Sequence, residues 1–506
     1  MIAAIFNFFR QTDVLISGFI NLRLLSVFKK SEHSKTYSLL KKISSLSSGQ
    51  AVMFLTVFAA VSWITVLFLG FKSFIIILPA VFLLSAANPL YGIFSFIVLF
   101  MFDLPNDIAS GLTVHSAETV LFFIILGFFV HLMVFGADKK NEYTGISLFL
   151  VITVFSLISI LYVPEKKSVL KGLMRVCEPV VFFAAVSLFF RKENFLKMLS
   201  LAFTLSVIPL LSVSLYHFLY IRELLIFIPF SENFFLFRPS GGMGVTALPA
   251  YLNIIFPVSL IGVILFSRGK KYPGFLLFLS ALIPAVMFAV PSSRAGWIVF
   301  FIFLSAFIPL LFLKKSPLAA YKKPFLIILV SSAFLGVFLI NIISEGRGYE
   351  AFKYRITDSF TPETSSAESA MGRVEFIKLA LNILKDSPLG VGPGNYHNSL
   401  TSYIDSDSID RAVFHHLHNL HLQTAVEYGL HVYLAALVLF LYLFFLLTQK
   451  MQNSQAPEDK SICMLFMLCL GIFFIQGFFD VFTVFARGAQ YGIIFGMIAG
   501  YLNKTS

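Results

Sequence analysis

Charged residues are scarce in this chain of 506 residues, where Asp, Glu, Lys and Arg together make up only 13%. A soluble globular protein carries about 25% charged residues, so the main body of this chain is not a soluble domain. The cysteines Cys177, Cys463 and Cys469 lie in apolar stretches without the spacing of a disulfide framework or a zinc site. Residues 1–50 show no pattern of a cleavable signal sequence, because basic residues interrupt them.

Hydrophobic residues make up 58% of the chain, with a mean hydropathy of +0.87. They occur in blocks long enough to cross a hydrocarbon layer of roughly 30 Å. Such segments must be helices, since a barrel would show short alternating strands. We therefore predict an all-α polytopic membrane protein with about 12–14 transmembrane helices and one large extracytoplasmic loop bearing short helices. The net charge of +12 fits the basic inner loops of membrane proteins, so no nucleic-acid partner is predicted.

Fourteen spans are predicted, with a merged count of twelve as the alternative: 51–71, 73–88, 90–103, 118–136, 145–163, 177–190, 197–220, 247–267, 273–290, 296–313, 325–343, 430–448, 461–480 and 485–502. The connections 137–144, 191–196, 268–272, 314–324 and 449–460 each carry at least two Lys or Arg. The positive-inside rule places them in the cytoplasm together with both termini. The connection 164–176 breaks this rule, either through an error in the topology or as a basic surface for an anionic lipid head group.

Four regions follow from this pattern: a basic cytoplasmic or interfacial segment at 1–50, transmembrane helices over 51–343, a large extracytoplasmic loop at 344–429, and C-terminal transmembrane helices over 430–506. In the loop, Val374, Ile377, Leu381 and Leu384 recur at steps of three and four, with Ala380 beside them, which predicts a helix with one apolar face. Residues 386–395 are rich in Gly and Pro and predict a turn.

Four histidines stand close together at the end of this loop, at positions 415, 416, 418 and 421. The spacing of His415, His418 and His421 would place all three on one helical face. They could cap a membrane helix in wet surroundings, bind zinc, or supply a general base that titrates near neutral pH. No carboxylate or cysteine accompanies them at clear ligand spacing, so no metal is predicted.

Two arginines stand at the ends of predicted spans, Arg238 before one span and Arg294 between two others. A charge at bilayer depth costs several kcal/mol, so such a residue either reaches the interface or serves a function. The charge pattern puts both arginines on the same side of the membrane as the histidines. A guanidinium group can grip a phosphate through two hydrogen bonds. Arg373 is a third candidate, with a solvated helix charge as its alternative.

Six segments follow one another over residues 238–445: Arg238-Pro-Ser-Gly-Gly, Ser293-Arg294-Ala-Gly, Gly372-Arg373-Val-Glu, Pro388-Leu-Gly-Val-Gly-Pro-Gly394, His416-Leu-His418-Asn419 and Glu427-Tyr-Gly429. This ordered set resembles the O-antigen ligase and O-antigen polymerase superfamily of bacterial membrane glycan transferases. The resemblance covers under half of the chain. The extra histidines at 415 and 421 depart from the family pattern, and the family does not require the basic N-terminal segment.

The resemblance implies a sugar chain on undecaprenyl diphosphate as donor, a glycan or lipid-linked acceptor, and a site on the extracytoplasmic side of the bacterial plasma membrane. No cofactor is expected, and no metal either, because fixed cations can neutralise a leaving diphosphate. Arg238, Arg294 and Arg373 would hold the diphosphate, and Asn419 and Glu427 would support the site. His418, directly before Asn419, would be the base, with His416 as its rival.

The expected activity is therefore glycan transfer in O-antigen or exopolysaccharide assembly, as a polymerase or a ligase, with protein glycosylation not separated from these by sequence. A transporter or flippase of lipid-linked saccharides is the alternative. That function predicts charged residues inside several spans and an internal repeat. Neither is evident in the sequence.

Overall fold

The computed structural model describes most of the chain. The described residues are 2–19, 35–46, 48–99, 105–109, 112–135, 144–162, 177–187, 193–215, 247–267, 273–289, 293–343, 353, 365–396, 399, 403, 417–481 and 487–503.

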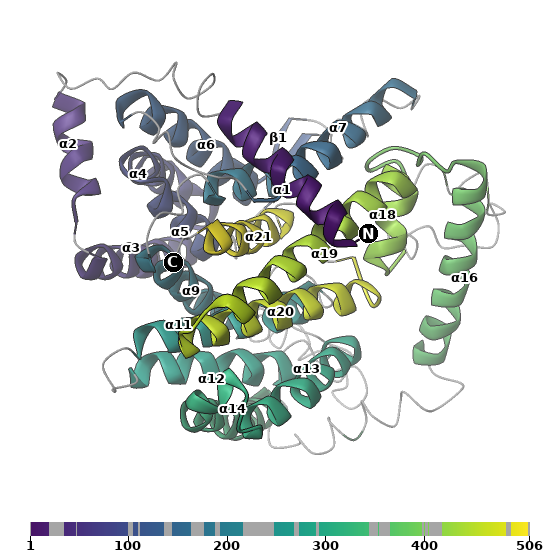
Figure 1. Ribbon diagram of the computed structural model, residues 1–506. Helices are drawn as coiled ribbons and strands as arrows, with labels where there is room; N and C mark the ends of the chain where they lie inside the picture. The colour runs from purple at the N-terminus through teal and green to yellow at the C-terminus, as the bar shows by residue number, and fades with distance from the viewer. Residues whose placement is uncertain are drawn as a thin grey trace, which may run out of the picture.

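Helices account for nearly all of the described structure (Figure 1). The N-terminal half contains α1 (Ile2–Phe19), α2 (Lys35–Ser44), α3 (Ser48–Leu69), the 3-10 turn η3 (Gly70–Ser73), α4 (Phe74–Ala87), α5 (Pro89–Leu99), α6 (Ser116–Phe135), α7 (Ile146–Tyr162), a helix at Cys177–Ser187, and α9 (Glu193–Leu205). The C-terminal half contains α11 (Ala247–Phe266), α12 (Gly274–Ala289), α13 (Arg294–Phe312), the 3-10 turn η5 (Pro317–Tyr321), α14 (Lys322–Ile343), α16 (Ser365–Asp386), α18 (Leu420–Tyr428), α19 (Leu430–Asn453), α20 (Pro457–Gly477) and α21 (Arg487–Asn503).

Length and composition allow six of the described helices to cross a membrane: Phe195–Leu215, Ala247–Phe266, Arg294–Phe312, Pro317–Ile342, Leu430–Asn453 and Pro457–Gly477. Seven shorter apolar helices accompany them, from Gln50–Val66 to Gly274–Ala289. A helix suits this environment because it satisfies every backbone hydrogen bond within its own segment. The prediction of an all-α polytopic membrane protein is confirmed.

One short hairpin adds to the helices within the predicted connection 104–117. Strand β1 (Pro105–Ala109) pairs antiparallel with β2 (Leu112–His115), and Pro105 lies opposite His115. Strand pairing is irregular between Asp107 and Ala109. The hairpin was not predicted, because its strands of five and four residues are too short to show a clear alternating pattern.

Helix α11 lies at the centre of the bundle, where it packs against α9, α12, α13 and α20. Its residues from Ala247 to Leu265 are all buried. A helix that is apolar all round belongs in such an interior position. In contrast, α14 leaves Phe334, Val337 and Phe338 exposed, as expected of a helix that faces hydrocarbon.

Helix α16 stands at the edge of the molecule and crosses the direction of the bundle helices (Figure 1). The helix was predicted, but the assignment of its apolar face was wrong in part, since Leu384 of the predicted set does pack against the buried cluster. Phe376, Ala380 and Ile383 are buried in a cluster with Val426 of α18, whereas Val374, Ile377 and Leu381 are exposed. Both faces of this helix carry apolar residues, so periodicity alone could not decide which one is buried.

Candidate active site

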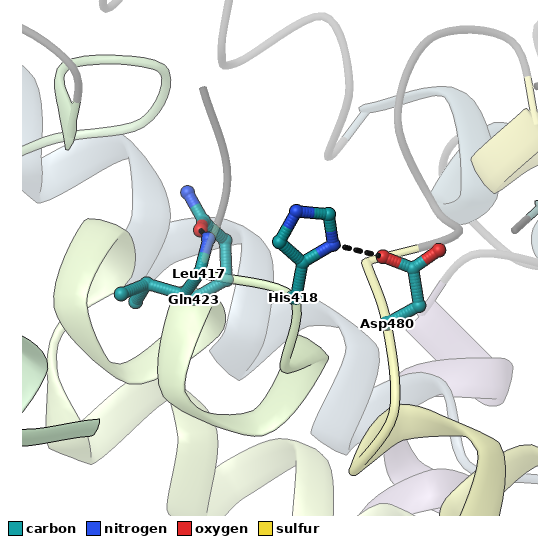
Figure 2. A network of polar contacts seen from close by, with 4 residues as sticks. All are labelled: Leu417, His418, Gln423 and Asp480. Carbon is teal, nitrogen blue, oxygen red and sulfur yellow. Dashed lines mark hydrogen bonds and ion pairs between the residues drawn. The ribbon is translucent and has the colours of Figure 1, made fainter. Parts of the chain in front are cut away.

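His418 and Asp480 form the polar pair at the centre of the candidate site (Figure 2). The ring nitrogen Nδ1 of His418 lies 3.1 Å from Oδ1 of Asp480, and the two side chains are 37% and 4% exposed. A carboxylate accepts hydrogen bonds, so Nδ1 donates its hydrogen to Asp480. The other ring nitrogen, Nε2, is then the one with a lone pair that can take a proton.

The backbone at His418 presents the ring outside any helix. His418 has a φ of +47°, a left-handed conformation that is uncommon for residues other than glycine. Asn419 follows as the N-cap of α18, and its side-chain oxygen accepts the backbone N–H of Leu422 at 3.0 Å. The expectation that His418 shares a helical face with His421 was therefore wrong, because the cap starts the helix only at Leu420.

A chain of buried hydrogen bonds holds the backbone on the other side of His418, at Leu417. The backbone N–H of Leu417 donates to Gln423 Oε1 at 2.9 Å, and Gln423 Nε2 donates to Glu427 Oε1 at 2.7 Å. Figure 2 shows Gln423 facing Leu417 on one side of the turn and the His418 ring extending toward Asp480 on the other. Gln423 and Glu427 are both buried, so this chain of hydrogen bonds is shielded from water. These bonds restrain the left-handed residue between them, and such strain persists only where its surroundings hold it.

The glycine-rich turn after α16 docks onto the end of α18. Val391 and Gly392 donate their backbone N–H groups to the carbonyls of Val426 and Glu427, at 2.8 and 2.9 Å. Gly390 has a φ of +90°, and a Cβ there would lie 2.5 Å from the backbone nitrogen of Gly429. The predicted turn is confirmed, and it ties the loop to the helix that follows His418.

Replacing Gly390 by Ala should destabilise the protein by about 2 kcal/mol or more, because both the left-handed backbone and the close contact with Gly429 oppose a Cβ. The thermal midpoint of purified protein in detergent measures the effect. Gly274→Ala is the matched control, since a Cβ at Gly274 meets nothing within 4 Å. Equal midpoints for the two variants would contradict this account of the turn.

His421 has a structural role that differs from that of His418. Its Nε2 lies 2.9 Å from the carbonyl oxygen of Phe474, which can only accept, so the ring donates this bond. The ring also packs against Tyr433, Phe474 and Phe478. It thereby joins α18 to α19 and α20. The two described histidines of the cluster, His418 and His421, thus contact different partners.

Burial lowers the pKa of His421 from its ordinary value of 6.5, and the bond to Phe474 opposes this shift only in part. The unfolded chain therefore binds a proton more readily than the folded one, and the contribution of neutral His421 to stability is lost as pH falls below 6.5. We expect the thermal midpoint of the wild type to drop more steeply on acidification than that of His421→Gln, which can still donate to Phe474. Parallel pH profiles would refute this role.

Arg294 lies at the end of the bundle that carries His418. It is the first residue of α13, directly after the N-cap Ser293. Asn253 of α11 donates to the carbonyl of Gly296 at 3.0 Å and lies 3.3 Å from Gln476 in the last turn of α20. Asp480 follows that turn and reaches His418. One buried asparagine therefore ties the start of α13 to the end of α20.

An anion would be favoured at the start of α13. Arg294 brings a full positive charge, and the helix N-terminus adds a partial positive charge. The Ser293 side chain accepts the N–H of Gly296 at 3.4 Å. The remaining predicted residues are placed less completely. Arg238 and His416 lie outside the described residues, and of Arg373 only its position within α16 is described.

Sequence reasoning missed Asp480 and Gln423. Asp480 ends an apolar span and is distant from His418 in the chain, so no local pattern linked them. The available signal was a carboxylate at the last residue of the span 461–480, which was predicted to end on the outer side. Gln423 gave a weaker signal, through its spacing of four residues from Glu427 on a helix.

A comparison with protein families finds a match over residues 278–437 to the family described as O-antigen ligase. The matched segment begins in α12 and ends in α19, so it includes Arg294, α16, the glycine-rich turn and His418. No protein with a curated description matches the chain.

Proposed function

We propose that this protein transfers a glycan from a polyprenyl diphosphate to an acceptor hydroxyl during surface polysaccharide assembly. The match of residues 278–437 to the O-antigen ligase family supports this proposal. Undecaprenyl diphosphate is the proposed carrier. The reaction is that of a polymerase when the acceptor is another lipid-linked glycan, and that of a ligase when it is a lipid-borne core. The site faces the extracytoplasmic side of the bacterial plasma membrane, with both termini in the cytoplasm, and needs no metal.

The observation that carries this proposal is the His418–Asp480 pair at the end of the bundle where Arg294 begins α13. A base needs a lone pair directed toward substrate, and the bond from Nδ1 to Asp480 leaves that role to Nε2. A diphosphate leaving group needs fixed positive charge. Arg294 supplies it, and Arg238 and Arg373 are proposed to share this role.

The proposed step forms one bond and breaks one. The acceptor oxygen attacks the anomeric carbon of the donor sugar, while the bond from that carbon to the diphosphate oxygen breaks. The acceptor proton passes to Nε2 of His418, and Asp480 stabilises the imidazolium through Nδ1–H. The electron pair of the broken bond leaves on the diphosphate, where arginine stabilises it. Attack opposite the leaving group inverts the anomeric centre.

The surface glycans of a deletion strain test the function. Single repeat units on the acceptor would identify a polymerase, and full-length chains left on the lipid carrier would identify a ligase. Loss of long-chain glycan with neither product, together with lipid-linked donor held on the cytoplasmic side, would favour a flippase and refute transfer. Purified protein with lipid-linked donor should turn over in the presence of a chelator. Activity that is lost and returns only with added metal would refute the metal-independent reaction.

Asp480→Asn should lower turnover by about 10²-fold or more while His418 stays in place. An asparagine can present its amide N–H to Nδ1 and stabilise the tautomer whose Nε2 carries hydrogen and cannot act as a base. Asp480→Glu serves as the conservative variant and should recover part of the rate. Initial rates on reconstituted protein, normalised to the amount of folded protein, make the measurement. A fall in thermal midpoint without a fall in rate would show that Asp480 is only structural.

A further inference from the structure

A polar cavity of about 630 Å³ lies at the end of the bundle opposite His418. Helix α19 begins beside α18 and is 24 residues long, which spans about 36 Å, and its last turns form one wall. The N-terminal helix α1 forms another wall, and the turn to α20 and the end of α21 complete it. Several residues of the lining carry neutral amide or hydroxyl groups: Thr144, Gln449, Asn453, Ser454, Gln455 and Asn503.

The two carboxylates of the cavity are already engaged within the protein. Asp13 is buried and accepts the backbone N–H groups of Gly145 and Ser147 at 2.7 and 2.9 Å. The hydroxyls of Ser147 and Tyr442 also donate to it, at 2.7 and 3.2 Å. Asp13 therefore caps the start of α7, where the helix dipole further offsets its charge.

The second carboxylate, Asp459, accepts the hydroxyl of Tyr501 at 2.8 Å and that of Ser454 at 3.4 Å. It lies in the first turn of α20, a favourable place for negative charge. Hydrogen bonds and helix dipoles thus offset the negative charges of both carboxylates, which weakens their repulsion of an anion in the cavity.

Two cations face the same space. Lys450 donates to the backbone carbonyls of Tyr501 and Leu502 at 2.7 and 3.5 Å, so it is fixed at the wall. Arg10 of α1 is exposed at the cavity, and no hydrogen bond or ion pair joins it to another residue in the described part of the chain. A fixed lysine and an available guanidinium, surrounded by neutral donors, suit a phosphate-bearing anion.

The position of α1 indicates where that anion comes from. Phe6 and Phe9 pack against Tyr442 of α19, whereas Phe8 and Leu15 on the opposite side are 62% and 74% exposed. A helix held to the protein by one face and apolar on its free face belongs at the membrane surface, with its outer side among the lipids. The mouth of the cavity beside Arg10 then lies at the depth of lipid head groups.

We propose that this cavity binds the phosphate of an acidic phospholipid head group in the leaflet opposite the candidate active site. The neutral amides contact the glycerol part of the head group, and Arg10 and Lys450 contact its phosphate. All the residues that line this cavity lie outside the family match at residues 278–437. The site does not depend on the proposed transfer reaction.

Full-length protein in a detergent micelle tests the proposal through its thermal midpoint, titrated with short-chain phosphatidylglycerol. Arg10→Gln removes the available cation and leaves no buried partner unpaired. Lys315→Gln is the matched control. Lys315 is an exposed cation shortly after Phe312, the last residue of α13, and it does not line the cavity. Phosphatidylcholine, inorganic phosphate and glycerol phosphate are titrated in parallel.

We expect phosphatidylglycerol to raise the midpoint to a plateau, with an apparent affinity about fivefold weaker in Arg10→Gln and unchanged in Lys315→Gln. Saturation by inorganic phosphate or glycerol phosphate with the same dependence on Arg10 would support the phosphate site but overturn a lipid as its source. An equal response of the two variants would mean attraction to surface charge in general and would overturn the site. So would a response to phosphatidylcholine equal to that of phosphatidylglycerol.

Discussion

His418→Ala should lower the rate of glycan transfer by about 10²–10⁴-fold, the contribution of a positioned general base. The ring is partly exposed and contacts Asp480 and Phe376, so its loss should leave the protein folded in the membrane. Reconstituted protein with a lipid-linked donor gives the rate, and a thermal midpoint confirms the fold.

His418→Gln is the sharper companion of this variant. Its amide can still bond to Asp480, but it cannot take a proton, so its rate should fall as far as that of His418→Ala. Recovery of most of the rate by glutamine would show that His418 only positions its neighbours. The role of base would then pass to His416 or another group in the loop.

Arg294→Ala should lower turnover by about 10²–10³-fold, the usual cost of removing one group that stabilises developing negative charge. The loss should appear mainly in kcat, because the charge on the diphosphate grows as the bond to the sugar breaks. Initial rates over a range of donor concentrations separate this effect from weaker donor binding.

Arg294→Lys separates charge from geometry at the same position. Lysine keeps the positive charge but loses the two-pronged donor, so we expect partial recovery of the rate. If alanine and lysine both leave turnover unchanged, Arg294 has no part in the reaction. If the alanine and lysine variants both lower the thermal midpoint, and by the same amount, the role of Arg294 is to hold the start of α13.

The sequence was sufficient for the features that depend on composition and local pattern. Long apolar segments predicted the membrane helices, because hydrocarbon demands internal backbone hydrogen bonding. The turn at 386–395 was predicted from its content of Gly and Pro, and Gly390, Gly392 and Gly394 adopt the positive φ values that glycine permits. An asparagine before an apolar run also signals a helix N-cap, and Asn419 caps α18 in this way.

The features that sequence could not give depend on contacts between distant segments. Asp480 meets His418 only because α18 and the end of α20 are brought together, partly through the bond from His421 to Phe474. The same holds for Asn253, which joins α13 to α20 from the central helix. The buried face of α16 depended on which side meets α18, and both sides are apolar.

The structure of the full-length protein with a bound lipid diphosphate donor tests the central claim most directly. The proposal predicts the diphosphate within hydrogen-bond distance of the Arg294 guanidinium, and the anomeric carbon in front of His418 Nε2 with room for an acceptor oxygen between them. A diphosphate held at the α1 end of the bundle, or an Arg294 side chain turned away from a donor bound beside His418, would contradict it.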